Sequence, residues 1–369
     1  MNTFEFFDVR NVMNEHPDCL YYLCYGERSS GKTFSSLDYS LERYFSTGEQ
    51  FAYIRRFGEQ IKQTFMMDLF SGILREKRIE KWSGGEWDGI TFKMGKFYLT
   101  RTIEGETEVC KNPCGHAFGL NLMENYKSLE YPKIMTIIFD EFISRSIYLS
   151  NEFVLFQNML STIIRLRTGV KIIMLGNSVN RYSLYFTEMG LKQVKTQEPG
   201  TTDVYQYGDS GLKVACCYTD PAKKSGGKPS DIYFAFDNPA LKMITEGGWE
   251  IGLYPHLTED YLPMDVIADF FVEFDKELLH GEVIVNDNGA YIFFHIKTTP
   301  IKDEDGDIVY TTYAIEKWNY KMCLTRQGDK LSKFIMNAVR ENKVFYSTND
   351  VGEIFRNYLI WSDSYNVKN

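Results

Sequence analysis

Residues 26–33 read Gly-Glu-Arg-Ser-Ser-Gly-Lys-Thr, which is a complete G-x-x-x-x-G-K-[ST] pattern. The apolar run 20–25 comes directly before it, and apolar residues at helical spacing follow from Phe34. A strand, a glycine-rich turn and a helix in this order predict a P-loop, whose backbone N–H groups point into one concavity and bind phosphate. The segment therefore predicts a nucleoside triphosphate site.

The positions of this motif have separate predicted roles. Lys32 is expected to reach the β- and γ-phosphates, and the Thr33 hydroxyl is expected to bind Mg²⁺. Arg28 could contact phosphate or switch between partners, and its alternative is a solvated side chain. ATP and Mg²⁺ are the expected cofactors. The residues expected to bind the nucleotide are Gly26, Arg28, Ser29, Ser30, Gly31, Lys32 and Thr33.

The apolar run 134–139 ends in Asp140-Glu141. A run without alternation predicts a central parallel strand that is buried on both faces. Asp140 would then hold the magnesium shell, and Glu141 would polarise the attacking water. A glutamate base is typical of hydrolytic motors, and the chain has no Asn-Lys-x-Asp motif for guanine. These features predict ATP hydrolysis, with a small-molecule kinase as the alternative.

A second apolar run, 170–175, leads to Asn177. Strands that alternate with helices predict a mainly parallel sheet, and ligands bind at the carboxyl ends of its strands. Asn177 is therefore a candidate for sensing the γ-phosphate or positioning the lytic water. Its alternative role is to stabilise the turn after the strand.

A basic group from a neighbouring subunit would stabilise the charge that develops on the transferred phosphoryl group. Arg165 and Arg167, near the end of a predicted helix over 154–166, are candidates, and Lys127 is another. The two arginines could instead compensate the helix dipole. Arg55 and Arg56 could contact phosphate, contact DNA or lie solvated.

Composition favours an ordinary globular protein. The 369 residues are 44% hydrophobic and 25% charged, with a net charge of −9, and this length predicts two domains. No apolar run has the length of a membrane span, so we expect no membrane partner and a location in the cytoplasm. Cys110, Cys114 and His116 suggest zinc, but a fourth ligand is not evident and a plain loop is the favoured interpretation.

The second half changes character. Glycine, proline and lysine are frequent after residue 197, and strands are expected at 282–286, 290–297 and 308–315. Three antiparallel strands followed by a helix, a strand and a helix are the element order of a ribonuclease H-like domain. We therefore predict a P-loop ATPase domain over 1–197, a lid or linker over 198–245 and an α+β ribonuclease H-like domain over 246–369.

The P-loop, the segment from Gly115 through Asp140-Glu141 and the segment Leu175-Gly176-Asn177 resemble a known family. They are similar to the genome-packaging ATPases of small tailed phages of the phi-twenty-nine-like type. These belong to the additional-strand, catalytic-glutamate (ASCE) class of P-loop ATPases, in its FtsK/HerA-related branch. The resemblance covers roughly residues 15–195.

The resemblance implies a homomeric ring, a pentamer, that packages double-stranded DNA at the portal vertex of a prohead in the host cytoplasm. DNA would be held through its phosphates, without regard to sequence. The portal, and a packaging RNA, would be further partners. The C-terminal domain would have lost nuclease activity, because Glu282 lies at a predicted strand edge and Ile284, Phe293 and Phe294 fill the middle positions. The alternative is a working nuclease that uses Glu273, Asp275 and Asp287.

Two other functions fit the residues. A helicase or a conjugative DNA pump would use the same fold, and strand separation would reveal it. A nucleotide-binding switch or scaffold would bind ATP without continuous turnover. ATP hydrolysis that rises with added duplex DNA would exclude the switch.

Overall fold

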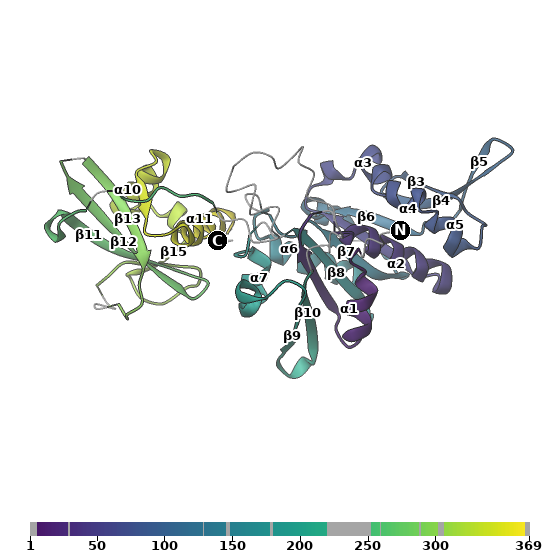
Figure 1. Cartoon of the computed structure of the whole chain (residues 1–369), viewed down its shortest axis with the longest axis horizontal. Helices are drawn as coiled ribbons and strands as arrows, with labels where there is room; N and C mark the ends of the chain where they lie inside the picture. Colours follow the sequence, from purple (N-terminus) through teal and green to yellow (C-terminus); the bar gives the residue numbers. More distant parts are fainter. Residues whose placement is uncertain are drawn as a thin grey trace, which may run out of the picture. The chain divides into compact units, whose positions relative to one another are not determined.

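The computed structural model describes residues 6–28, 30–127, 129–144, 148–177, 180–219, 252–258, 260–287, 289–301 and 306–365 (Figure 1). The chain divides into two compact units, each built from more than one segment. Unit 1 comprises Met1–Ser144, Glu152–Arg181 and Glu188–Trp249, and unit 2 comprises Arg145–Asn151, Tyr182–Thr187 and Glu250–Asn369.

Unit 1 contains a ten-stranded sheet with the order β3-β4-β6-β2-β7-β8-β1-β10-β9, and β5 pairs with β4. The central strands β6, β2, β7, β8, β1 and β10 run parallel, as the apolar runs predict. The strands are β1 (Tyr21–Gly26), β2 (Gln50–Arg55), β3 (Gly89–Lys93), β4 (Lys96–Ile103), β5 (Glu106–Val109), β6 (Gly115–Gly119), β7 (Ile134–Asp140), β8 (Lys171–Asn177), β9 (Thr202–Tyr207) and β10 (Leu212–Tyr218).

Strand β8 lies between β1, which leads into the P-loop, and β7, which ends in Asp140. One strand thus separates the two strands that carry the phosphate-binding and the acidic motifs. This is the additional-strand arrangement expected from the order of the motifs along the chain.

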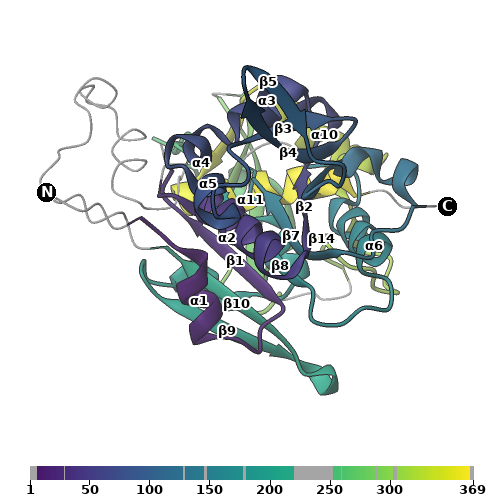
Figure 2. The ribbon, with the colours of Figure 1, turned by 90° about the vertical axis from the view of Figure 1, so that its right-hand side faces the viewer.

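Helix α2 (Lys32–Thr47) follows the P-loop and lies against one face of this sheet (Figure 2). It ends at Gly48, whose left-handed conformation lets its N–H bond the carbonyl of Tyr44. Residues at alternate positions of the strands face α2 in one core, among them Tyr53 and Ile138. The other helices of unit 1 are α1 (Val9–Glu15), α3 (Gln63–Asp68), α4 (Ser71–Arg75), α5 (Arg78–Ser83) and α6 (Glu152–Ile164).

One expectation for unit 1 needs correction. Residues 202–218 of the expected lid or linker are strands β9 and β10 of the main sheet, and β10 is buried from Val214 to Tyr218. Residues 220–245, the second part of the expected lid or linker, lie outside the described residues.

Unit 2 contains a six-stranded sheet with the order β15-β14-β11-β12-β13-β16. Helices α10 and α11 contribute to its core together with Phe270, Ile292 and Phe294. Its elements are α7 (Leu184–Glu188), whose last residue belongs to unit 1, β11 (Val266–Phe274), β12 (Glu277–Asn286), β13 (Gly289–Ile296), β14 (Val309–Thr311), β15 (Tyr320–Met322), α10 (Lys330–Arg340), β16 (Val344–Tyr346) and α11 (Asn349–Ser364).

The three antiparallel strands of unit 2 are β11, β12 and β13, so the expectation was displaced by one strand. The segment expected as the third strand forms only β14, which pairs with β11 in parallel. Glu282 lies in the middle of β12 rather than at a strand edge. The assignment was wrong because Leu278 to Gly281 were read as preceding the strand.

No helix among the described residues is both long and apolar enough to cross a membrane. The 3₁₀ segments are short, and the one before β7 runs over Leu120–Tyr126.

Buried apolar residues of the two units form separate clusters, one under α2 and one under α10 and α11. Each unit therefore has its own core.

Candidate functional site at the carboxyl edge of the sheet of unit 1

The carboxyl ends of β1, β7 and β8 meet at one edge of the sheet. In the strand register Gly26 is paired with Asn177, and Asp140 is paired with Leu175. The P-loop, the acidic pair and the candidate sensor are thus brought to the same edge from three separate parts of the sequence. This is the arrangement that the sequence predicts.

Two glycines permit the shape of the P-loop. Gly26 has φ of +154°, and a Cβ there would lie 2.1 Å from the Thr219 hydroxyl oxygen. Gly31 has φ of +93° and precedes α2 directly. A side chain at either position would collide with its surroundings or strain the backbone. The glycines of the motif are therefore required by geometry.

Lys32 is buried, with only 6% of its surface exposed. Its Nζ donates to the carbonyl oxygen of Glu27 at 2.6 Å and to the hydroxyl of Ser30 at 3.0 Å. Burial lowers the pKa of Lys32 to about 8. A phosphate bound in the loop would place a negative charge beside this ammonium group.

Asp140, the last residue of β7, lies beside α2, the helix that follows the P-loop. Its Oδ2 accepts a hydrogen bond from the Tyr53 hydroxyl at 2.6 Å and lies 3.3 Å from the Thr33 hydroxyl. Ile138 faces α2, and Asp140 follows two residues later, so strand alternation turns Asp140 to the same face. Burial raises the pKa of this carboxyl, although the Tyr53 hydroxyl and Arg55 oppose that effect.

Glu141 is held by an arginine from the neighbouring strand β2. Arg55 Nη2 donates to Glu141 Oε2 at 2.5 Å, and Arg55 Nη1 lies 3.6 Å from Asp140 Oδ2. Glu141 has φ of +59°, so the backbone turns sharply directly after the strand. More than half of the Glu141 side chain is exposed, at 54%, which leaves it accessible to water.

Arg56 fixes the loop that follows Glu141. Its Nε donates to Glu152 at 2.7 Å, and its other nitrogens donate to the carbonyls of Glu141 at 3.1 Å and Phe142 at 2.9 Å. Both Arg56 and Glu152 are buried. Arg56 thus has a positioning role behind the acidic pair, which differs from the phosphate and DNA contacts considered for it.

A cavity of about 410 Å³ opens beside the P-loop. Gly31, Phe34 and Ser35 line it from α2 and its preceding loop, and Phe6, Phe7 and Arg75 add to its walls. The backbone N–H of Phe7 donates to the carbonyl of Ser30 at 3.0 Å, which fastens this segment to the P-loop. The cavity offers aromatic surface for a base next to the phosphate-binding loop.

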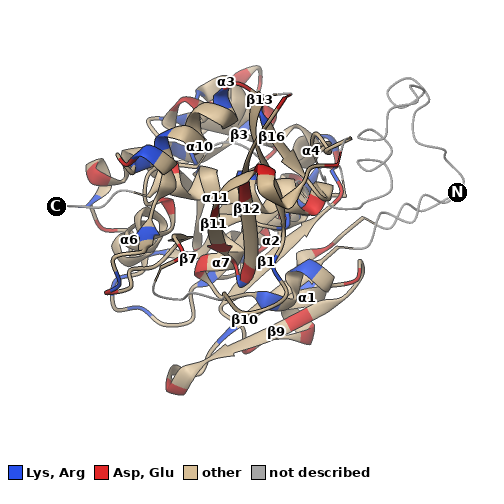
Figure 3. Ribbon diagram, turned by 90° about the vertical axis from the view of Figure 1, so that its left-hand side faces the viewer, with Lys and Arg blue, Asp and Glu red and all other residues tan. Residues whose placement is uncertain are grey.

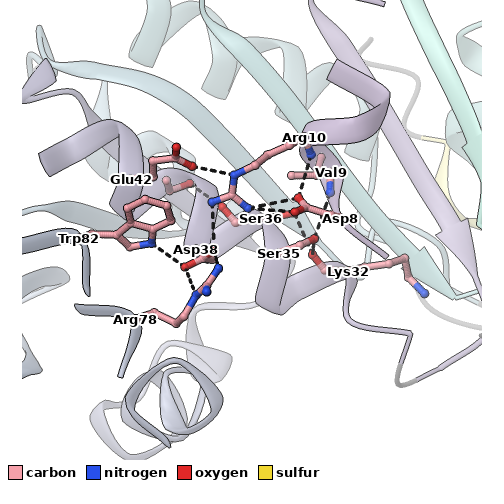
Figure 4. Close-up of polar contacts among 11 residues, drawn as sticks. Asp8, Val9, Arg10, Lys32, Ser35, Ser36, Asp38, Glu42, Arg78 and Trp82 are labelled. Atoms are coloured by element: carbon pink, nitrogen blue, oxygen red, sulfur yellow. Dashed lines mark hydrogen bonds and ion pairs between the residues drawn. The ribbon is translucent and has the colours of Figure 1, made fainter. Parts of the chain in front are cut away.

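A buried carboxylate fixes α2 beside this cavity (Figure 4). Asp38, 1% exposed, accepts hydrogen bonds from Arg10 at 2.9 Å, Trp82 at 2.7 Å and Arg78 at 2.8 Å. The partners come from α1 and α5, so a single side chain ties three helices together. The sequence predictions did not include this group, since its members are distant in the chain.

The other residues predicted for the ATP site make fewer contacts that bear on their roles. Asn177 is the last residue of β8 and stands level with Gly26. Arg28 is exposed, and Ser30 is buried and accepts from Lys32. Ser29 lies outside the described residues. The predicted positions that the structure describes therefore stand at or beside the same loop.

Three basic residues were predicted to act on the nucleotide of a neighbouring subunit. They lie together, away from the P-loop. Lys127, Arg165 and Arg167 line one cavity of about 660 Å³. Arg167 donates to the carbonyls of Pro132 at 3.1 Å and Ile164 at 3.2 Å, and also to that of Ile134. Ile134 begins β7 and Asp140 ends it, so this cavity is at the opposite end of that strand, roughly 20 Å away.

Arg165 and Lys127 have looser contacts than Arg167. Arg165 donates to the carbonyl of Leu129 at 3.0 Å and lies 3.5 Å from Glu130, and about half of its side chain is exposed. Lys127 pairs with Glu124 at 2.6 Å and is also half exposed. These two side chains can be released at little cost, because exposed ion pairs contribute about 0–1 kcal/mol.

The cysteine and histidine residues that suggested zinc do not form a ligand cluster among the described residues. Cys114 is buried with its Sγ 3.5 Å from the carbonyl of Phe97, and Cys110 is half-buried. His116 Nε2 lies 3.3 Å from the amide oxygen of Gln50, and burial lowers the pKa of His116 to about 4.

Two residues of the site were missed or read differently from the sequence. Tyr53 was not singled out, and Arg55 was not linked to Glu141. Both lie on β2, two residues apart, and strand alternation therefore puts them on one face. That alternation was the available signal, but the neighbour strand of β2 could not be read from sequence.

Known proteins resemble this chain in sequence and in fold. DNA packaging proteins of Bacillus phages phi29 and B103 are 30% identical over 164 residues and 31% identical over 170 residues. The alignments cover 44% and 45% of this chain and 43% and 46% of those proteins. The chain thus matches less than half of the length of these curated relatives.

Two solved structures share the fold over nearly the whole chain. The Phi-28 gp11 DNA packaging motor has a TM-score of 0.56 at 16% identity and covers both chains fully. The bacteriophage Phi-29 viral genome packaging motor assembly has a TM-score of 0.54 at 18% identity, with coverage of 96% and 99%. The family model of the podovirus DNA encapsidation protein (Gp16) matches residues 4–195, over half of the chain. The chain therefore belongs to the podovirus DNA encapsidation protein family.

Proposed function

We propose that this chain is an ATP-driven translocase that packages double-stranded viral DNA into a preformed prohead. The proposal rests on one observation above the others: the Thr33 hydroxyl of the P-loop helix lies 3.3 Å from the Asp140 carboxylate, with Glu141 directly after it. The P-loop and the acidic pair, to which we assign phosphate binding and water activation, thus lie at one edge of the sheet.

The residues present fit ATP and Mg²⁺. Thr33 and Asp140 would hold the ion, because hydroxyl and carboxylate oxygens are the donors that Mg²⁺ prefers and the two groups lie 3.3 Å apart. The ion would neutralise charge on the phosphate oxygens. Lys32, enclosed in the loop, would bind the terminal phosphates, and the cavity lined by Phe6, Phe7 and Phe34 would receive the base.

Glu141 would act as the base that orients and deprotonates the attacking water. In the structure its carboxylate is bonded to Arg55, which competes with water for the same oxygen. We infer that Glu141 must leave Arg55 before hydrolysis. Arg55 would thereby couple the rate of hydrolysis to any movement of the end of β2.

Asn177 would sense the γ-phosphate from the end of β8, since its register position beside Gly26 brings it to the phosphate-binding edge. The group from the neighbouring subunit would be Arg165 or Lys127. Arg167 is the weaker candidate, because its guanidinium is already bonded to carbonyls at the end of α6 and the start of β7.

The partners of this motor are proposed from family membership. The subunits would form a ring, a pentamer, around duplex DNA and contact its phosphates without regard to sequence. The ring would act at the portal of the prohead in the host cytoplasm, with a packaging RNA as a further partner. The solved relatives described above are packaging motors, which supports an assembly of this kind.

Unit 2 would serve this motor as a ribonuclease H-like domain without nuclease activity. A nuclease that uses two Mg²⁺ ions needs several carboxylates around them. Glu282, although it is in the middle of a strand, has the imidazole of His295 at 3.6 Å. A domain with this composition would dock the motor rather than cut DNA.

Steady-state ATP hydrolysis by the full chain, with and without duplex DNA, tests the proposal. We expect hydrolysis that duplex DNA stimulates and that Glu141→Gln removes while ATP still binds. Turnover that does not respond to duplex DNA would contradict a translocase. Strand separation coupled to hydrolysis would instead indicate a helicase.

A further inference from the structure

One face of the sheet of unit 2 carries a group of side chains of the types that bind metal ions, outside the proposed ATP site. His280, Glu282 and His295 each offer one ligand atom, and these atoms lie within 4.8 Å of one another. The three residues come from β12 and β13, which are adjacent strands of this sheet (Figure 1). No other such group occurs among the described residues.

The backbone register explains why these residues meet. His280 is directly opposite His295 in the β12–β13 pair, and their ring centroids are 4.8 Å apart. Glu282 follows His280 by two residues and therefore projects from the same face. Leu279, Gly281 and Val283 alternate with them on the buried face, where a Cβ on Gly281 would collide with the Phe270 ring.

Each candidate ligand residue has a hydrogen-bond partner that limits the rotation of its side chain. Asp269 Oδ1 lies 2.6 Å from His280 Nε2, which leaves Nδ1 as the ligand atom of His280. His295 Nδ1 lies 3.1 Å from the carbonyl of Ile296, which directs Nε2 toward Glu282 at 3.6 Å. The Tyr261 hydroxyl donates to Glu282 Oε2 at 2.5 Å.

This pattern is the usual surrounding of a metal-binding histidine. Such histidines almost always give their second nitrogen to a carboxylate or a backbone carbonyl, which fixes the ring and its tautomer. Here one histidine has the carboxylate and the other has the carbonyl. The His280 ring also stacks on Phe271 with centroids 4.8 Å apart, which further limits its rotation.

We propose that His280, Glu282 and His295 form a binding site for a divalent transition-metal ion, with zinc as the preferred ion and water in the fourth position. Adjacent ligand atoms around tetrahedral zinc are roughly 3.3 Å apart, given metal–ligand distances of about 2.0–2.1 Å. The separation of 3.6 Å between His295 Nε2 and Glu282 Oε2 is near this value. Small side-chain rotations would bring the third ligand into place.

The ligand types separate this site from that of a magnesium nuclease. Mg²⁺ takes oxygen ligands and keeps several waters, whereas imidazole suits zinc, copper, iron and nickel. Two of the three donors here are imidazole nitrogens, and Asp269 is engaged with His280. Acidic residues are visible on β11 and β12 in Figure 3, but the cluster itself is a mixed set of nitrogen and oxygen donors.

The test uses the untagged full chain after removal of metal by a chelator. Zinc binding is measured by competition with a chromophoric chelator, and Co²⁺ is added separately to record its visible spectrum. We expect one zinc per chain and an intense Co²⁺ spectrum of a four-coordinate site. His280→Ala and His295→Ala should each weaken zinc binding by about 100-fold or more, and Asp269→Asn by about 10-fold.

Two variants serve as controls. His256→Ala removes a histidine whose Nδ1 lies 2.9 Å from the carbonyl of Tyr346, outside the cluster, and it should leave zinc affinity unchanged. Cys110→Ser removes a half-buried thiol of the cysteine pair in unit 1 and should also have no effect. Glu282→Gln preserves the shape of the side chain and removes its charge. It therefore tests the site if an alanine variant does not fold.

Several outcomes would overturn the proposal. Zinc affinity that is equal in the wild type and in the His280→Ala/His295→Ala variant would show that the cluster is only a hydrogen-bonded network. Loss of zinc binding in Cys110→Ser would place the ion in unit 1. Tighter binding of Mg²⁺ or Mn²⁺ than of zinc would indicate a site of oxygen ligands.

Discussion

Arg55 and Glu141 form an ion pair with 2.5 Å between Nη2 and Oε2, and the same guanidinium lies 3.6 Å from Asp140. Arg55 ends β2, Asp140 ends β7 with Glu141 directly after it, and the two strands are neighbours in the sheet. The proposed base is thus held by a cation at the edge where ATP would bind. Release of Glu141 from this pair is the step that we expect to control hydrolysis.

We expect Arg55→Ala to raise hydrolysis in the absence of DNA and to reduce its stimulation by duplex DNA, because Glu141 no longer has to be released. Arg55→Lys, which keeps a charge, should be intermediate. The rates with and without duplex DNA measure this. Arg101→Ala is the matched control, because it removes an arginine of β4 that pairs with Glu108 of β5. Normal DNA stimulation in Arg55→Ala would show that the ion pair has no controlling role.

Glu141→Gln should reduce the rate of hydrolysis by about 10²–10⁴-fold and leave ATP affinity nearly unchanged, since the amide cannot accept the proton of the water. Equilibrium binding and steady-state turnover on the same preparation separate the two effects. Glu86→Gln, at an exposed turn, should behave as the wild type. Full turnover in Glu141→Gln would remove Glu141 from the mechanism.

ATP affinity should fall as the pH rises above about 8. Burial lowers the pKa of Lys32 to about 8, so the ammonium group that binds phosphate loses its proton in this range. Below pH 8 the lysine is charged and affinity should be at its maximum; above it, affinity should fall by up to about tenfold per pH unit. Titrations from neutral to alkaline pH measure this. Lys32→Met should bind weakly at every pH, and a constant wild-type affinity would contradict the prediction.

Asp38→Ala should destabilise unit 1 by about 3 kcal/mol, because it leaves Arg10, Arg78 and the Trp82 N–H without their buried acceptor. Urea unfolding measures the change. Glu42 is a partly exposed partner of Arg10, so Glu42→Gln should cost at most about 1 kcal/mol. Equal effects of the two substitutions would show that Asp38 is not the centre of the group.

Arg167→Ala should lower the melting temperature, because it removes the donor to several carbonyls at the end of α6. Arg165→Ala and Lys127→Ala should leave the melting temperature nearly unchanged. Whichever of the two acts in the neighbouring subunit should lose about 10³-fold or more in turnover with ATP binding intact. Mixing that variant with Glu141→Gln subunits measures rescue across the interface. If neither substitution lowers turnover, the group from the neighbour lies elsewhere.

Much of unit 1 could be predicted from sequence because its signals are local. The P-loop pattern and the continuous apolar runs of β7 and β8 are read within a few residues, and their register brings Asp140 and Asn177 to one edge. What could not be read is which distant strands become neighbours. The Arg55–Glu141 pair and the Asp38 group depend on such contacts.

Unit 2 was harder to predict for a related reason. Val266 to Phe274 were not recognised as a strand, and Leu278 to Gly281 were read as preceding one. These errors hid the position of Glu282 in the middle of β12. The meeting of His280 with His295 follows only from the pairing of β12 with β13.

The central claim is that hydrolysis at Asp140-Glu141 moves duplex DNA. The most direct measurement is the amount of DNA that becomes protected from nuclease inside proheads, recorded together with ATP consumed, for the wild type and for Glu141→Gln. We predict protected DNA in proportion to ATP consumed for the wild type, and neither for Glu141→Gln. Protection by Glu141→Gln at the wild-type level, or hydrolysis by the wild type without protected DNA, would contradict the claim.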